Sequence, residues 1–214
     1  MVKREELSET PFTLWFTGLP SSGKSTVAKI VENRLRRRGV NIENLDADDL
    51  RSNLHPDLGF TKEERGINNR RIGFISQLLN KNGVGVIVAA ISPFKEYREV
   101  ARELIEEQGR YFQIYVHCPL EICKQRDPKG LYEEAGKGNI PNFTGVSHPF
   151  EEPRSDEYDL RIDTMDQAAE ECAGQVIEML ERESILEHVD RTTGLTEVEE
   201  DKIRDKLRRL GYLA

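Results

Sequence analysis

The sequence predicts an α/β protein in which helices cover both faces of a central parallel β-sheet. Short apolar runs alternate with longer amphipathic segments along the chain, and such strand–helix alternation is typical of parallel sheets. The run at residues 84–91 is almost continuously apolar, as expected for a strand that is buried on both faces. A third observation is a glycine-rich turn at residues 18–25, which lies between a predicted strand and a predicted helix.

That turn reads Gly18-x-x-x-x-Gly23-Lys24-Ser25 and follows an apolar run at residues 12–17. It matches the phosphate-binding P-loop pattern, in which glycines let backbone N–H groups approach phosphate oxygens. We expect Lys24 to reach the β- and γ-phosphates of a nucleotide, and the Ser25 hydroxyl to hold magnesium. The sequence therefore predicts a P-loop that binds a nucleotide with Mg²⁺. The remaining predicted nucleotide-binding residues of this turn are Ser21, Ser22 and Thr26.

The strand–helix alternation continues after the P-loop. Helices are predicted at residues 24–38, 61–82, 95–108, 119–126 and 166–183, and strands at 41–45, 84–91, 111–116 and 158–162. Thr61 and Glu64 match a capping box, which marks the start of the second of these helices. Residues 51–60 are polar, contain Pro56 and Gly59, and are predicted to be a loop with at most one turn of helix.

Two segments depart from the alternation. Glycine and proline are spread through residues 127–157 without periodicity, and a stretch this long is more often functional than an idle connection, so we predict a lid at 127–150. Residues 1–183 are assigned to one kinase domain, with residues 1–11 as a polar leader. Residues 184–214 are assigned to a C-terminal helical extension of unknown role, because Val198, Ile203, Leu207 and Leu210 have roughly helical spacing.

The composition restricts the class of protein. The chain has 214 residues and a net charge of −8, so we expect no broad surface that binds nucleic acid. Three cysteines without metal-ligand spacing fit a reduced, cytoplasmic setting. The first residues carry charge and resemble no signal peptide, and no run approaches the roughly 18 apolar residues of a membrane span.

Acidic residues follow the second predicted strand, at the sheet edge where parallel sheets bind ligands. Asp46 and Asp48 are candidates to support magnesium and to orient or deprotonate an acceptor hydroxyl, although acidic surface turns are common. If the strand continues that far, alternation places both carboxylates on the same side. We predict Asp46 as the base that faces magnesium and the acceptor, and Asp48 as an acceptor-binding residue.

Basic and aromatic residues surround the predicted acceptor side. Arg51 and Arg65 suit a bidentate grip on phosphate or sulfate oxygens, whereas Arg70 and Arg71 are better explained as ordinary surface charge. Phe60 lies in a polar loop, where it suits stacking on a base better than core packing. Phe143 in the predicted lid raises the same question, and the two rings together suggest a clamp on a nucleotide-like acceptor.

The chain resembles the adenylylsulfate kinase (APS kinase) family from the P-loop to about residue 183. The motifs that carry the resemblance are GLPSSGKST at residues 18–26, LDADDLR at 45–51, DLGF at 57–60, RGINNRRIG at 65–73, ISPF at 91–94, RDPKGLY at 126–132 and NFTG at 142–145. The first is shared by many families, but the last two together are close to specific for this one.

The resemblance implies a P-loop kinase fold that binds ATP with Mg²⁺. It implies transfer of the ATP γ-phosphoryl group to the 3′-hydroxyl of adenosine 5′-phosphosulfate (APS), giving 3′-phosphoadenosine 5′-phosphosulfate (PAPS). It implies that Phe60 and Phe143 sandwich the acceptor's adenine, and it implies a homodimer. The acceptor residues it implies are Arg51, Arg65, Asn68, Ile91, Ser92, Lys129, Gly130 and Thr144. Cys118 and Arg126 are implied beside the adenine of ATP.

One departure leaves the acceptor open. The family usually reads Asp-Gly-Asp-Asn where this chain has Asp46-Ala47-Asp48-Asp49, and an aspartate at 49 adds negative charge beside an anionic acceptor. One alternative is therefore the same fold with another nucleotide-like anionic acceptor or a small polyol. A second alternative is a nucleotide-binding regulator without turnover, although Lys24 and Ser25 are both in place.

Overall fold

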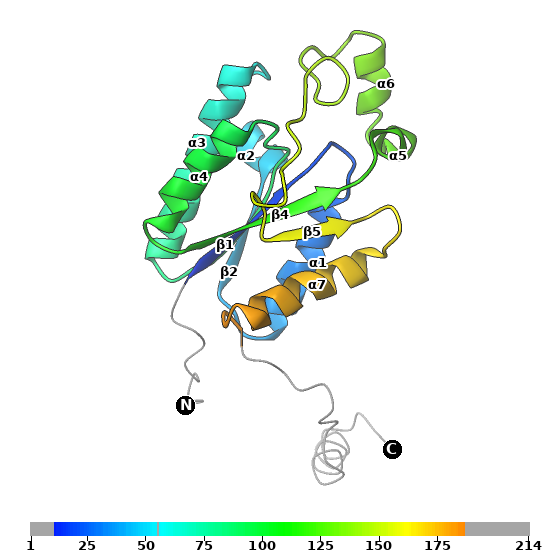
Figure 1. Cartoon of the computed structure of the whole chain (residues 1–214). Coiled ribbons are helices and arrows are strands. Elements are labelled where there is room, and N and C mark those ends of the chain that lie inside the picture. Colours follow the sequence, from blue (N-terminus) through cyan, green and yellow to red (C-terminus); the bar gives the residue numbers. More distant parts are fainter. Residues whose placement is uncertain (1–10, 55, 187–214) are drawn as a thin grey trace, which may run out of the picture.

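The computed structural model describes residues 11–54 and 56–186 (Figure 1). Residues 1–10 of the predicted leader (1–11) and residues 187–214 of the predicted helical extension (184–214) lie outside these residues. Within the described part, one five-stranded, all-parallel sheet has the order β2-β3-β1-β4-β5. Its strands are β1 (Phe12–Thr17), β2 (Ile42–Asp46), β3 (Gly85–Ala89), β4 (Arg110–His117) and β5 (Leu160–Asp163).

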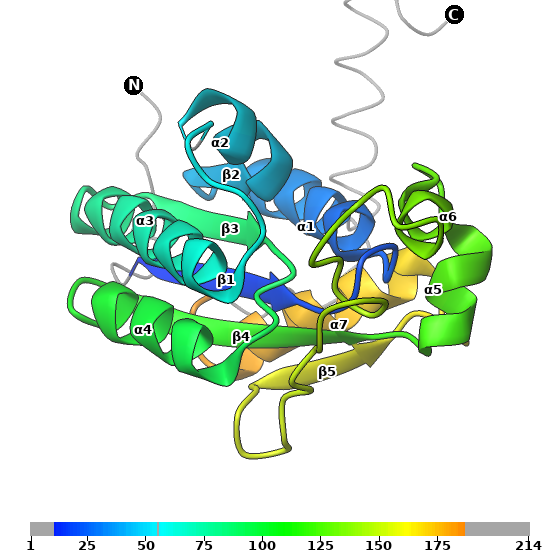
Figure 2. The same cartoon turned by 90° about the horizontal axis from the view of Figure 1, so that it is seen from above.

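Helices cover both faces of this sheet, so the predicted fold class is confirmed. Figures 1 and 2 show α1 (Lys24–Arg37) and α7 (Ala169–Arg182) on one face, and α3 (Lys62–Lys81) and α4 (Lys95–Glu106) on the other. The shorter helices lie near the carboxyl ends of the strands: α2 (Ala47–Asn53), α5 (Leu120–Arg126) and α6 (Leu131–Gly136). No helix in the described ranges is long and apolar enough to cross a bilayer.

The central strand β1 is wholly buried because both of its faces are covered. Leu14 and Phe16 pack with the residues of α1 and α7, whereas Trp15 points to the opposite face and packs with α3 and α4. This alternation follows from the period of two in a strand. Because β1 pairs with both β3 and β4, its carboxyl end opens at the point where the strand order reverses.

Helices α3 and α4 lie unusually close to each other. A side chain at Gly73 of α3 would place its Cβ only 3.1 Å from the Cα of Ala101 in α4. The predicted capping box is present at the start of α3, where the Thr61 and Glu64 side chains each accept the other's backbone N–H. The site end of α3 is therefore fixed both by its cap and by α4.

The acidic segment after β2 differs from the sequence prediction. The strand ends at Asp46, and α2 begins at Ala47 rather than the backbone remaining extended. The Asp46 carboxylate causes this change, because it accepts the backbone N–H groups of Asp48 (2.8 Å) and Asp49 (3.3 Å) as an N-cap. Strand alternation therefore does not set the direction of Asp48, and the predicted loop at 51–60 begins as helix.

The predicted lid also contains structure that its sequence did not reveal. Helix α6 lies within the stretch predicted to be irregular, and it is too short to show a helical period. The Asp127 carboxylate accepts the backbone N–H groups of Tyr132 (3.0 Å) and Glu133 (3.1 Å) at its start. Tyr132 packs against the ring of Phe143 in a small apolar cluster that is separate from the main core.

The end of the described chain belongs to the main core. Ile185 and Leu186 follow α7 and are both buried against it, although they fall in the segment predicted to be an appendage. The packed body of the protein therefore continues at least to Leu186.

Candidate active site

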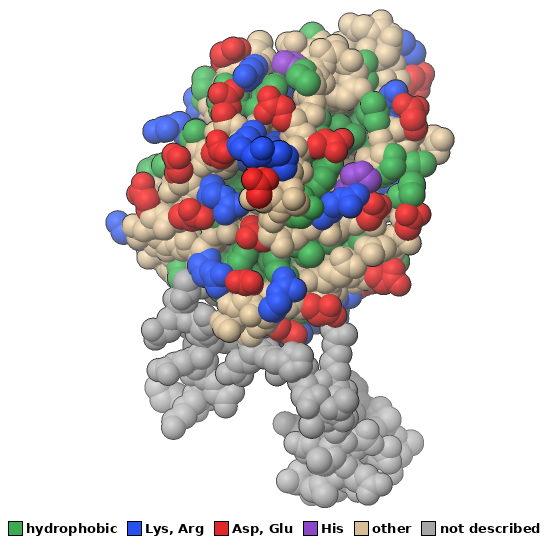
Figure 3. Space-filling view, in the orientation of Figure 1, with side chains coloured by type: hydrophobic (Ala, Val, Ile, Leu, Met, Phe, Trp, Pro, Cys, Tyr) green, Lys and Arg blue, Asp and Glu red, His purple; other side chains and the backbone are tan. Residues whose placement is uncertain are grey.

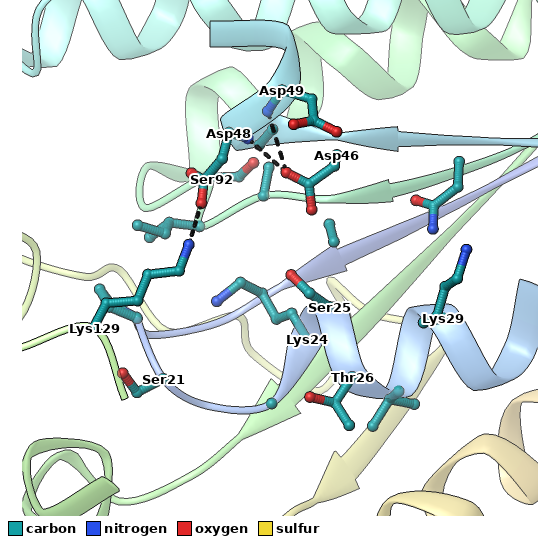
Figure 4. Close-up of a pocket in the computed structure, with 18 of the residues that line it drawn as sticks. Ser21, Lys24, Ser25, Thr26, Lys29, Asp46, Asp48, Asp49, Ser92 and Lys129 are labelled. Atoms are coloured by element: carbon teal, nitrogen blue, oxygen red, sulfur yellow. Dashed lines mark hydrogen bonds and ion pairs between the residues drawn. The ribbon is translucent and has the colours of Figure 1, made fainter. Parts of the chain in front are cut away.

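A cavity of about 1230 Å³ opens at the carboxyl ends of β1, β2 and β3. The P-loop, the start of α2 and the first turns of α3 line it, together with the segments after β3 and α5. Figure 4 shows side chains of the P-loop, α2 and the segment after α5 converging on this space. The site residues predicted from separate motifs are therefore largely brought together.

The P-loop turns tightly under β4. A Cβ at Gly18 would lie 2.4 Å from the carbonyl oxygen of Val116, so only glycine fits there. Gly23, with φ 95°, occupies the left-handed region and starts α1. Ser21, Ser25 and Thr26 line the cavity, while the side chain of Ser22 is buried beneath the loop.

Lys24 lies across the P-loop with its amine buried. Its Nζ donates to the carbonyl oxygens of Gly18 (3.0 Å) and Leu19 (2.7 Å). Burial lowers the pKa of this amine to about 8, partly opposed by the nearby Asp48. An anionic phosphate in the loop would replace the two neutral carbonyl groups as partner and favour the charged amine.

Two carboxylates, those of Asp46 and Asp48, lie across the cavity from the P-loop. Asp46 uses one oxygen to cap α2, and Figure 4 shows its carboxylate above the Ser25 hydroxyl of α1. Asp48 lies farther toward the lid, where it accepts from the Lys129 amine at 2.6 Å. The structure thus separates the two aspartates into one that faces the P-loop and one that faces the lid.

Phe60 lies between two arginines at the cavity wall. Its side chain is 43% exposed, and the guanidinium carbons of Arg51 and Arg65 lie 4.4 and 5.5 Å from its ring centre. Arg51 donates to the carbonyl oxygens of Leu58 and Gly59, and Arg65 to those of Phe60 and Asn142. Carbonyl oxygens carry no net charge, so these bonds fix both guanidiniums without neutralising them.

The electrostatics of this pair favour a bound anion. Burial lowers the pKa of Arg51, and it lowers the pKa of Arg65 to about 10 with a further contribution from the charge of Arg51. The Arg65 guanidinium is therefore largely shielded from water and faces a like charge, whereas Arg51 is half-buried and has Asp48 and Glu64 nearby. An oxyanion held between them would relieve both costs.

Ser92, at the end of β3, is held by three other elements. Its hydroxyl accepts from the Trp15 indole N–H (3.1 Å) and donates to the Asn69 carbonyl (3.3 Å), while its backbone carbonyl accepts from Arg98 (3.0 Å). These bonds hold its backbone at the positive φ of 43°. Ile91 and Asn68, which were predicted as acceptor residues, also line the cavity.

Several predicted site residues do not reach the cavity. Phe143 is 7% exposed and packs edge-on to Tyr132, with ring centres 5.1 Å apart, so the predicted clamp with Phe60 is wrong in this structure. Cys118 is buried in the same cluster, and Thr144 is also fully buried. Gly130 lies at the start of α6 beside the lining residue Lys129.

Other residues of the site carried no sequence signal. Thr164, after β5, donates its hydroxyl to the Ser22 carbonyl (2.8 Å) and accepts from Arg126 (3.2 Å). Asn69 supports Ser92 from α3. Thr164 lies in no motif, and Asn69 lies within the motif of residues 65–73 but was not singled out there. Each acts through a contact between segments far apart in the chain. Arg71 forms a two-point ion pair with Asp57, in agreement with the surface role predicted for it.

Comparison with known proteins identifies the family. A sequence profile described as adenylylsulphate kinase matches residues 10–163. The chain belongs to the adenylylsulphate kinase family. An adenylyl-sulfate kinase of Halothermothrix orenii is 45% identical over 174 residues, which cover 81% of this chain and 91% of that protein. Another, of Thermodesulfovibrio yellowstonii, is 48% identical over 161 residues, covering 75% and 80%.

A solved structure supports the same relationship. The APS kinase of Mycobacterium tuberculosis in complex with AMPPNP and APS superposes with a TM-score of 0.77 and 42% identity. The match covers 80% of this chain and 98% of that one. A gluconokinase of Sinorhizobium meliloti matches at 17% identity with a TM-score of 0.55, which shows a common fold alone.

Proposed function

We propose that this adenylylsulphate kinase transfers the γ-phosphoryl group of ATP to the 3′-hydroxyl of APS, giving PAPS and ADP. The observation that carries the proposal is one cavity with a P-loop on one side and Phe60 between Arg51 and Arg65 on the other. Such a wall suits an acceptor that has both a flat base and an oxyanion group. The relative solved with AMPPNP and APS supports the same pair of ligands.

ATP is assigned to the P-loop. Backbone N–H groups of residues 18–26 and the start of α1 surround the expected position of the β- and γ-phosphates. The Lys24 amine then stabilises the negative charge that develops between these phosphates during transfer. The Arg126 guanidinium, which donates to Thr164, borders the expected position of the ATP adenine.

The residues present fit a magnesium ion that is bound together with ATP. Magnesium in kinases keeps several waters and takes one or two protein oxygens besides phosphates. Ser25 offers an accessible hydroxyl, and Asp46 retains a carboxylate oxygen that does not cap α2. When bound, the ion would neutralise phosphate charge in the transition state.

Asp46 is assigned as the residue that orients or deprotonates the acceptor hydroxyl. It faces the P-loop, whereas Asp48 is paired with Lys129 on the lid side. Asp48, Asn68, Ser92 and the lid residues Lys129 and Gly130 are assigned to acceptor binding and closure. Since Phe143 lies in the lid cluster, base stacking is assigned to Phe60 alone in this conformation.

Two further properties belong to the proposal. We expect a homodimer, and we expect the protein to act in the cytoplasm. Asp49 lines the cavity and adds a negative charge there. This observation favours a test of acceptors that differ in charge.

A coupled ADP-release assay tests the proposal directly. APS, adenosine 5′-phosphate and gluconate are offered as acceptors at equal concentration with ATP and magnesium. We expect turnover with APS to exceed turnover with either other acceptor by at least about 100-fold. Binding of adenosine 5′-phosphate or gluconate would leave a buried arginine without a partner, and this costs free energy. Comparable turnover with another acceptor would reassign the substrate, and ADP release with none would indicate a binding protein.

A further inference from the structure

An arginine is buried behind the turn that carries Ser92. Arg98 lies in the first turn of α4 and is only 2% exposed. Its Nη1 donates to the backbone carbonyl of Ser92 at 3.0 Å, whereas its Nη2 has no hydrogen-bond partner in the described residues. Arginine is almost never fully buried unless it is paired, so its presence here needs a physical explanation.

The charge of Arg98 is only partly compensated. The Glu157 carboxylate lies 3.8 Å from its Nη2, which is too far for a hydrogen bond. The other oxygen of Glu157 accepts from Lys95 (2.9 Å) and Arg154 (2.7 Å) instead. An apolar side chain at position 98 would avoid the cost of burying a charge, so packing of α4 alone gives no reason for an arginine.

The turn at residues 91–93 supplies that reason. Ser92 has a φ of 43°, in the left-handed region that residues with a side chain rarely adopt. Ile91, Ser92 and Pro93 line the cavity, so the conformation of this turn determines the shape of the acceptor side. The strain of such a residue and a hydrogen bond from a charged donor are of similar free energy. One bond from an arginine can therefore decide which conformation the turn adopts.

Among the described residues, Arg98 makes the shortest hydrogen bond to the Ser92 backbone. Thr17 also reaches the Ser92 carbonyl, but at 3.4 Å and with an uncharged hydroxyl that bonds the Ile91 carbonyl at 2.7 Å. Trp15 and Asn69 bond to the Ser92 hydroxyl, so they act on the backbone only through the side chain. Arg98 is therefore the group that acts on this backbone most directly.

We propose that Arg98 is a positioning residue for the acceptor, which holds Ser92 in its left-handed conformation and so keeps the turn at residues 91–93 in the shape that APS requires. Arg98 is not among the residues that line the cavity, and it acts from behind the turn without touching either substrate. This inference rests on the proposed function and adds a residue outside the motifs of the sequence to it.

The KM values of the two substrates test the proposal. Arg98→Met keeps an apolar stem of similar length and removes the charge and the donors. It should raise the KM for APS by at least about 10-fold, because the strained turn relaxes, and leave the KM for ATP within about 2-fold. Arg102→Met is the matched control, because Arg102 lies one turn farther along α4 and pairs with Glu106 and Asp159. It should leave both KM values unchanged.

A change at Ser92 separates positioning from direct attraction of an anion by a buried charge. Glycine adopts a positive φ without steric cost, so in Ser92→Gly the turn no longer depends on Arg98. Adding Arg98→Met to Ser92→Gly should then change the KM for APS by less than about 2-fold. If the charge of Arg98 attracted the acceptor directly, its loss would have the same effect in both backgrounds.

Three results would overturn the proposal. They are an unchanged KM for APS in Arg98→Met, equal rises in the KM values for APS and ATP, and an equal effect of Arg98→Met with and without Ser92→Gly. If Arg98→Met loses its cooperative melting transition, Arg98→Lys decides instead, because it keeps the charge but reaches less far. It should raise the KM for APS by at least about 3-fold in wild type and leave it unchanged in Ser92→Gly.

Calorimetry of APS binding in the presence of ADP judges the proposed function separately. A wild type that binds APS without turnover would contradict the proposed function only, and the dissociation constants of the variants would then decide the role of Arg98. A wild type that turns over APS, with no difference between wild type and Arg98→Met, would contradict the positioning role only. A wild type that does not bind APS would overturn both.

Discussion

At the scale of single residues, burial makes the charge of Lys24 depend on nucleotide binding. Its pKa of about 8 in the free protein must rise when phosphates enter the loop. We therefore predict that ATP binding at pH 8.5 takes up part of a proton and weakens as the pH rises further. At pH 6.5 the amine is already charged, so no uptake is expected from it.

Calorimetry in two buffers of different ionisation enthalpy measures this uptake. Lys24→Met serves as the control, because it removes the titrating group and should remove the difference between the pH values. Equal heats in the two buffers at pH 8.5 for wild type would show that Lys24 is charged before ATP arrives.

Asp46 combines a chemical role with a structural one, and two substitutions separate them. Asparagine is as good an N-cap as aspartate, so Asp46→Asn should keep α2 and the melting temperature while kcat falls by at least about 100-fold. Asp46→Ala should lose about 1 kcal/mol of stability in addition. Steady-state kinetics and urea unfolding provide the measurements. A larger loss of kcat in Asp48→Asn than in Asp46→Asn would reverse the assignment.

Phe60 tests whether an exposed ring binds substrate. Because it is largely outside the core, Phe60→Ala should leave the melting temperature nearly unchanged. The KM for APS should rise by roughly 5- to 150-fold, from the ~1–3 kcal/mol of base–aromatic stacking, while the KM for ATP stays constant. Phe143→Ala is the contrasting variant, since it removes a buried ring and should lower stability. An unchanged KM for APS in Phe60→Ala would show that Phe60 does not stack on the acceptor's base.

At the scale of elements, the predicted lid is the segment most open to test. Residues 127–150 contain α6 and contact the rest of the site in three ways: the exposed Lys129–Asp48 ion pair, the bond from Arg65 to the Asn142 carbonyl, and the bond from the Tyr132 hydroxyl to the Pro20 carbonyl. Exposed pairs of this kind contribute little free energy, so they do not hold a segment closed by themselves. We predict that hydrogen exchange in this segment slows when ADP and APS are bound together. The exchange of β1 serves as the internal control, and equal rates with and without ligands would argue against a lid.

Elements were predictable where one local pattern determines them. The strands and the long helices follow from hydrophobic period and capping, and the P-loop from a contiguous motif. The short helices α2 and α6 were not predicted because neither is long enough to show a helical period. Aspartates accept backbone N–H groups at the start of both helices. The direction of Phe143 escaped for another reason, since Tyr132 and the buried cysteines around it come from other parts of the chain. Local sequence does not encode such contacts.

At the scale of the whole molecule, the packed body is longer than the predicted domain. Ile185 and Leu186 are buried, and burying such side chains contributes about 1.5–3 kcal/mol each. We predict that a chain ending at Glu183 is less stable than the full chain by several kcal/mol, roughly 3–6 by this count. A chain ending at Leu186 should be more stable in urea unfolding than the chain ending at Glu183 by this amount. Equal stability of both shortened chains would show that these residues only rest on the surface.

The central position of β1 has a consequence for biosynthesis. Within residues 11–54 and 56–186 it comes first among the strands, yet both of its neighbours, β3 and β4, come from later parts of the chain. Until residues 85–117 have been made, the apolar run of β1 has no sheet to enter, and the P-loop that hangs from it has no fixed shape. Nascent chains therefore expose this run until β4 has been made, and they acquire a nucleotide site only after β4 has formed.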